Sequence, residues 1–94
     1  MKQITVNGMV FRVLYAGVSP FIDQLKMQVF YGDFSLGRLA GILDGNESIE
    51  YTDGENTETF EGYSRLTEIK YVDGETVVAF FEKGADNGAV SETL

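Results

Sequence analysis

The feature that most constrains this fold is the alternation of apolar and polar residues in short runs that end at turn signals. Ile4 and Val6 alternate with polar residues up to Asn7-Gly8. A second alternating run follows at once, with one face formed by Met9, Phe11, Val13 and Tyr15. A period of two is typical of a half-buried strand, and Asn-Gly favours a two-residue type I′ turn. The sequence therefore predicts an antiparallel hairpin near the N-terminus.

The same alternation continues through most of the chain. After a connection that contains Gly17 and Pro20, residues 24–31 alternate, with one face formed by Leu25, Met27, Val29 and Tyr31. Further strands are predicted at residues 48–52, 57–60, 63–72 and 76–83. The run at 76–83 carries apolar residues on both faces, which predicts a central strand that is covered on both sides.

Glycine-containing pairs separate the later strands. Asp53-Gly54 and Asp73-Gly74 each lie between two alternating runs. Asp-Gly suits a type I′ turn, which needs a positive φ at both central residues, so we predict a two-residue hairpin connection at each place. Glu61-Gly62 interrupts the long middle stretch of strand-like sequence between them, and a glycine inside a strand pattern usually marks a bulge or a bend.

The period changes once, near residues 34–43. Leu36, Leu39, Ala40 and Leu43 follow the spacing of one helical face. We expect Asp33 to cap the start of this helix and Gly45 its end. The fold class is therefore mainly β, at the margin of α+β. We predict about six or seven antiparallel strands and one short helix, arranged as a curled sheet, a partial barrel or a small sandwich.

Composition bounds the domain organisation and excludes several kinds of chemistry. A chain of 94 residues fits one domain, which we place at residues 1–84, followed by a flexible C-terminal tail at 85–94. Histidine and cysteine are both absent, so serine–histidine hydrolysis, cysteine nucleophiles and histidine-bound or thiolate-bound metals are excluded. We expect no enzyme activity, no cofactor, and no catalytic, cofactor-binding or metal-binding residues.

The net charge of −8 is unevenly distributed. Residues 1–43 hold four basic and two acidic side chains, residues 44–75 hold two and ten, and residues 76–94 hold one and three. An acidic chain repels phosphate groups, which disfavours nonspecific binding to nucleic acid or to anionic membranes. The first residues lack the apolar run of a signal peptide, and no stretch is long and apolar enough to span a membrane. These features predict a soluble intracellular protein.

The motif Tyr-x-Asp-Gly-Glu occurs at residues 51–55 and again at 71–75. As turn chemistry it needs no ligand, and this is the interpretation that we prefer. The alternative is that three acidic segments bind calcium, which requires six to eight oxygen ligands: Asp44-Gly45-Asn46-Glu47, Asp53-Gly54-Glu55-Asn56 and Asp73-Gly74-Glu75. None of the three has the spacing of an EF-hand loop.

A resemblance covers residues 57–83, TETFEGYSRLTEIKYVDGETVVAFFEK. It rests on Thr57, Phe60, Gly62, Tyr63, Ser64, Leu66, Ile69, Asp73-Gly74 and Val77-Val78, preceded by the leucines of the expected helix. This pattern resembles small proteins encoded in the structural modules of phages and prophages of Gram-positive bacteria. The resemblance implies a non-enzymatic protein associated with tail or virion genes, and it supplies no catalytic residues.

Two hypotheses of function follow. The first is a structural or assembly protein of a phage-like particle that binds other protein subunits, self-association included, and that binds neither nucleic acid nor membranes. Such a protein would reside in the cytoplasm of the bacterial host before assembly and then in the virion. The second is a small binding module whose acidic region, residues 44–75, recognises a basic peptide or a cation such as calcium.

Overall fold

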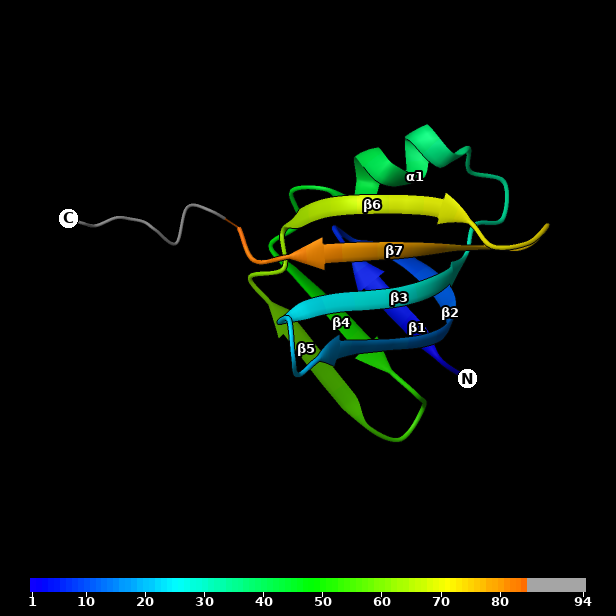
Figure 1. Ribbon diagram of the computed structural model, residues 1–94. Helices are drawn as coiled ribbons and strands as arrows, with labels where there is room; N and C mark the ends of the chain where they lie inside the picture. Colours follow the sequence, from blue (N-terminus) through cyan, green and yellow to red (C-terminus); the bar gives the residue numbers. More distant parts are fainter. Residues whose placement is uncertain (85–94) are drawn as a thin grey trace.

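The structure is a computed structural model that describes residues 1–84 (Figure 1). Its elements in chain order are β1 (Gln3–Val6), β2 (Met9–Ser19), β3 (Gln24–Phe30), α1 (Leu36–Leu43), β4 (Ser48–Thr52), β5 (Thr57–Glu61), β6 (Arg65–Tyr71) and β7 (Thr76–Glu82). The mainly β class with one short helix is confirmed. The expected tail at residues 85–94 lies outside the described residues.

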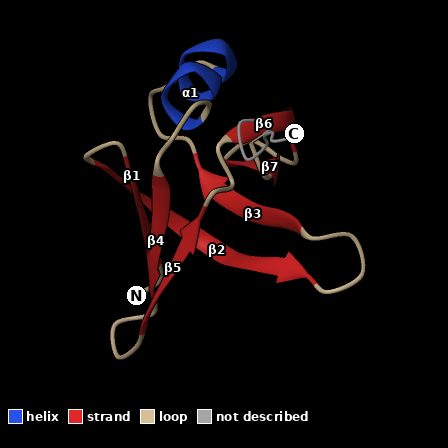
Figure 2. Ribbon diagram, turned by 90° about the vertical axis from the view of Figure 1, so that its left-hand side faces the viewer, coloured by secondary structure: helices blue, strands red, loops and turns tan. Residues whose placement is uncertain are grey.

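All seven strands form one antiparallel sheet in the order β5-β4-β1-β2-β3-β7-β6. The sheet is not closed into a barrel, because β5 and β6 lie at its two ends. Of the three predicted arrangements, the curled open sheet is the one observed. Figure 2 shows how it curls, with β4 and β5 diverging from the hairpin of β2 and β3.

Strand β2 is shared by both halves of this curled sheet. Its first residues pair with β1, and its later residues, through Ser19, pair with β3. The pairing with β3 shifts between Val13 and Tyr15, which marks a bulge at Leu14. A bulge bends a strand and increases its twist, and here it lies where the strand passes from one half of the sheet to the other.

The bulge overturns two details of the predicted N-terminal hairpin. The strand was expected to end before Gly17, whereas β2 continues through Ser19 and leaves only residues 20–23 as the connection. Tyr15 was also expected to share a face with Phe11 and Val13. It lies instead on the outer face, opposite Gln28, because the extra residue at the bulge reverses the alternation.

The turns differ from one another in type. Asn7 and Gly8 have φ values of 51° and 80°, so the two-residue type I′ turn is confirmed there. The turns at Asp53 and Asp73 are confirmed in position but not in type, since residues 53–56 and 72–75 separate the strands and neither aspartate has a positive φ. Glu61-Gly62 is a corner between β5 and β6, and Gly62 has a φ of 88°.

Helix α1 closes one end of the curled sheet (Figures 1 and 2). Its N-cap is Ser35, whose hydroxyl accepts a hydrogen bond from the Arg38 amide at 3.2 Å, so the predicted cap at Asp33 is wrong. Gly45 follows the C-cap with a φ of 74°, in the left-handed conformation expected after a helix. The side-chain amide of Asn7 donates to the Ile42 carbonyl at 2.9 Å and holds the helix to the β1–β2 turn.

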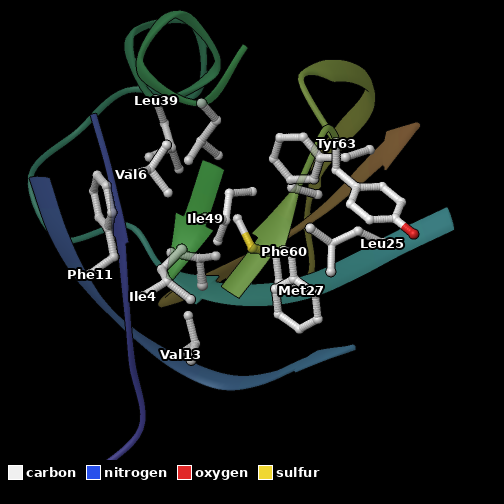
Figure 3. Close-up of a cluster of buried hydrophobic side chains, with 14 of the residues drawn as sticks. Ile4, Val6, Phe11, Val13, Leu25, Met27, Leu39, Ile49, Phe60 and Tyr63 are labelled. Atoms are coloured by element: carbon white, nitrogen blue, oxygen red, sulfur yellow. The ribbon is translucent and has the colours of Figure 1, made fainter. Parts of the chain in front are cut away.

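The core lies inside the curl and under α1 (Figure 3). Its fully buried members come from both halves of the sheet and from the helix: Ile4, Val6, Leu25, Met27, Val29, Leu39, Leu43, Ile49, Val77, Ala79 and Phe81. Strand β7 lies between β3 and β6, and Thr76 and Val78 on its outer face are also buried. The prediction of a strand covered on both faces is therefore confirmed.

Candidate interaction surfaces

The repeated Tyr-x-Asp-Gly-Glu motif forms two turns in which the aspartate binds the backbone of its own loop. Asp53 Oδ1 accepts hydrogen bonds from the amides of Glu55 at 2.9 Å and Asn56 at 2.8 Å. Asp73 Oδ1 accepts from the amides of Glu75 and Thr76, both at 2.8 Å, and from the Thr76 hydroxyl at 3.0 Å. These bonds explain why four-residue connections replace the predicted type I′ turns.

The same hydrogen bonds determine the electrostatics of the two turns. Backbone amides of Asn56 and Glu55 hold the pKa of the Asp53 carboxyl below its ordinary value. For Asp73, the amides of Glu75 and Thr76 lower the pKa in the same way. Within residues 1–84, no group of three or more acidic, histidine or cysteine side chains is placed to hold a metal ion.

The most exposed apolar residues lie at the tip of the β2–β3 hairpin. Phe21 is 93% exposed and Ile22 is 65% exposed. The loop that carries them is ordered by backbone bonds, because the Asp23 amide donates to the Ser19 carbonyl at 3.0 Å. Tyr63 anchors the loop further, since its hydroxyl donates to the Asp23 carboxylate. The fold thus presents two large apolar side chains to solvent on a well-defined turn.

Exposed apolar residues continue along β2 below this tip. Val10, Leu14 and Tyr15 are all exposed on the strand. The pairing of β1 with β2 extends only as far as Arg12, with one further hydrogen bond from the Val13 amide to the Lys2 carbonyl at 3.0 Å. Beyond that point, β2 has a strand neighbour on the β3 side alone within residues 1–84. We call the tip and these strand residues (Val10, Leu14, Tyr15, Phe21 and Ile22) the hairpin surface.

The outer face of β2, β3 and β7 combines cations with aromatic rings. The Arg12 guanidinium lies 4.6 Å from the centroid of the Phe30 ring. The Lys26 ammonium lies 5.8 Å from the Tyr15 ring and 5.6 Å from the Phe80 ring. Cations placed over aromatic faces in this way are attracted by the ring quadrupole. We call these five residues the cation–aromatic face.

Arg12 and Lys26 make no ion pairs in the described part of the chain, unlike the basic residues of the neighbouring strand β6. On the adjacent strand β6, Arg65 lies 2.5 Å from Glu82, and Lys70 lies 3.3 Å from Glu68. Within residues 1–84, no carboxylate lies within ion-pair distance of Arg12 or Lys26. The charges of both side chains are therefore available to a ligand.

A pocket of about 410 Å³ opens beside Arg12. It is lined by Arg12, Phe30, Tyr31, Gly32, Gly74 and Glu75. The Tyr31 hydroxyl donates to the Gly74 carbonyl at 2.6 Å, which ties the wall of the pocket to the β6–β7 turn. The pocket has room for a side chain, and Arg12 supplies a donor at its rim.

Neither the hairpin surface nor the cation–aromatic face was predicted from the sequence. The apolar pair Phe21-Ile22, which lies in the four-residue connection between β2 and β3, could have indicated the hairpin surface. It was overlooked because a longer loop was expected there. The cation–aromatic face depends on the pairing of β3 with β7, which are far apart in sequence.

In the part of the chain that the structure describes, no helix has the length and apolar character needed to cross a lipid bilayer. Comparison of the chain with models of known protein families, with curated proteins and with solved structures gave no match. The surface features above, together with the resemblance of residues 57–83, are therefore the basis for the proposed function.

Proposed function

We propose that this chain is a non-catalytic structural or assembly protein that binds other protein subunits, copies of itself included, through the hairpin surface. The single observation that carries the proposal is the exposure of Phe21 and Ile22 on an ordered turn. Large apolar side chains on a hydrogen-bonded loop gain from burial against a partner, because their apolar area leaves water and the loop backbone has little conformational freedom left to lose.

The arrangement of strands supports the same proposal. Within residues 1–84, the open sheet leaves two end strands, β5 and β6, with one unpaired edge each, and the part of β2 after Val13 has a further unpaired edge. Unpaired strand edges can pair with a neighbouring chain. An assembly protein uses such edges, whereas an isolated monomer has to protect them.

Residues 57–83 resemble small proteins from phage and prophage structural modules. We therefore propose that the particle to which this protein belongs is phage-like. Residues of that motif build the core and the corner of this fold. Phe60 and Tyr63 are buried, and Val77 is fully buried. In this proposal the motif maintains the scaffold, and the hairpin surface, which lies outside the motif, makes the contacts.

The absence of tryptophan from the chain allows a direct test. In the variant Phe21→Trp, a single tryptophan replaces the aromatic ring at the tip. We expect its emission to shift to the blue as protein concentration rises, because self-association buries it. Val72→Trp is the matched control, since Val72 is 51% exposed and lies away from the hairpin. Emission of the Phe21→Trp variant that stays characteristic of water at every concentration would overturn the proposal.

A further inference from the structure

The described residues are strongly polarised in charge. The hairpin of β4 and β5, residues 48–61, carries five carboxylates and no basic residue: Glu50, Asp53, Glu55, Glu58 and Glu61. The ion pairs within residues 1–84 are Arg65–Glu82, Lys70–Glu68 and Lys83–Asp23, and none of them involves this hairpin. We call it the acidic hairpin.

The acidic hairpin and the cation–aromatic face are complementary in charge. The acidic hairpin carries five carboxylates, and within residues 1–84 the one cation in contact with it is the Met1 ammonium, which donates to the Asp53 carbonyl at 3.4 Å. The cation–aromatic face carries Arg12 and Lys26, although Glu75 lines the pocket beside Arg12. In a chain of net charge −8, Arg12 and Lys26 are exposed, and neither makes an ion pair within residues 1–84. Complementary charges across an interface select the partner and fix its register.

One copy of the chain cannot bring these two surfaces together. Strands β4 and β5 belong to one half of the curled sheet, whereas β3 and β7 belong to the other half. Figure 2 shows the loop between β4 and β5 and the hairpin of β2 and β3 pointing in different directions. Contact between the surfaces therefore requires a second copy.

We propose that the acidic hairpin of one copy docks on the cation–aromatic face of the next. This inference rests on the proposed function, because it specifies how copies of the chain bind one another. Arg12 and Lys26 receive the carboxylates on the exposed outer face; the pocket beside Arg12 is not part of the contact, because Glu75 in its lining repels an acidic side chain. Leu14 and Tyr15, which are exposed on the same strand as Arg12, supply apolar contact next to the ion pairs.

The contact allows two kinds of symmetry. Two different surfaces of the same chain meet, so the contact is made either twice across a two-fold axis, in a closed dimer, or once per copy in a head-to-tail series. Head-to-tail contacts repeat from copy to copy, and they generate a ring when the rotation closes or a filament when it does not. Association of this kind weakens as salt concentration rises, because the paired charges are screened.

Charge reversal on each surface gives a test with an internal control. The first variant is Arg12→Glu with Lys26→Glu, and the second is Glu55→Lys with Glu58→Lys. All four side chains are exposed, so both variants keep the core intact. We expect self-association of each variant alone, measured by sedimentation velocity, to be weaker by at least about tenfold. An equimolar mixture should regain association, because the reversed face of one variant matches the reversed hairpin of the other.

The outcomes separate this inference from the proposed function. Self-association of both variants at the strength of the unaltered chain would overturn the docking contact and leave the hairpin surface as the interface. Loss of association that mixing does not restore would also overturn it. If the unaltered chain does not associate at all, both proposals fail. Tight binding of single-stranded DNA by the unaltered chain, lost in the Arg12→Glu, Lys26→Glu variant, would assign the face to nucleic acid instead.

Discussion

The hydroxyl of Tyr63 links two segments that are far apart in the sequence. It donates a hydrogen bond to the Asp23 carboxylate at the base of the β2–β3 turn, across 40 residues of sequence. Lys83 lies nearby, with its ammonium 3.8 Å from the other oxygen of Asp23 and 5.4 Å from the Tyr63 ring. The substitution Tyr63→Phe removes this one bond and keeps the buried ring in place.

The loss of stability in Tyr63→Phe can be worked out from the pKa of the Tyr63 hydroxyl. The hydrogen bond to Asp23, helped by burial and by the negative charge of Asp23, raises the pKa of Tyr63 from 10.0 to about 12. At 1.36 kcal/mol per pKa unit, two units correspond to about 2.7 kcal/mol. The Asp23 side chain is 60% exposed, so water screens the interaction, and we expect about 1–2 kcal/mol. For a chain of this length that lowers the melting temperature by about 5–10 °C.

The sign of the pH dependence is also determined. A raised pKa in the folded state means that the stabilisation is fully present below pH 10.0 and is lost as the pH rises towards about 12. The unaltered protein and Tyr63→Phe should therefore differ near neutral pH and converge in strong alkali. Thermal unfolding followed by circular dichroism at several pH values measures the difference directly.

A matched control separates this bond from a general effect of tyrosine removal. The hydroxyl of Tyr71 makes no hydrogen bond within residues 1–84, although its ring packs 5.4 Å from that of Tyr31. We expect Tyr71→Phe to leave the melting temperature unchanged near neutral pH. Equal melting temperatures for Tyr63→Phe and the unaltered protein near neutral pH would show that the hydrogen bond to Asp23 does not stabilise the fold.

Three further predictions concern the scaffold. Phe81→Ala truncates the largest fully buried side chain and leaves a cavity in the core, so it should lower the free energy of unfolding in urea by about 3–5 kcal/mol. Ser35→Ala should cost about 1 kcal/mol in the same assay, while Asp33→Ala should cost little, because Ser35 is the helix cap. Asp73→Ala should lower the melting temperature more than Asp53→Ala, since Asp73 accepts three hydrogen bonds and Asp53 two. Because the pKa values of both aspartates are lowered by folding, each carboxylate stabilises the folded state at a pH above the ordinary carboxyl pKa of 3.8. Thermal melts of the unaltered protein should therefore show stability falling as acid protonates these groups.

The strands and the helix were predictable because each is encoded locally. Alternation identified β3 and β7, and the i, i+3, i+4 spacing of leucines identified α1. The exact caps and turns were less predictable, because several residues compete for one role. Ser35 and Asp33 are both good helix caps, and the backbone geometry selects Ser35.

The interaction surfaces could not be predicted from local sequence patterns, because they depend on a bulge and on the pairing of distant strands. The bulge at Leu14 moves Tyr15 to the outer face, and nothing in the alternation of β2 indicates where the extra residue lies. The contact of Lys26 with Phe80 requires β3 to pair with β7, and strand order among distant segments is not contained in periodicity. The acidic hairpin was visible as a charge run, but its partner surface was not.

Both proposals depend on self-association of the chain. It is measured by the molar mass of the unaltered protein, from light scattering behind a sizing column over a wide range of concentration. We expect a mass that rises above the 10.4 kDa of one chain as concentration increases. The charged docking contact predicts in addition that the mass falls back towards 10.4 kDa at high salt. A mass of 10.4 kDa at every concentration, low salt included, would show that copies of the chain do not bind one another.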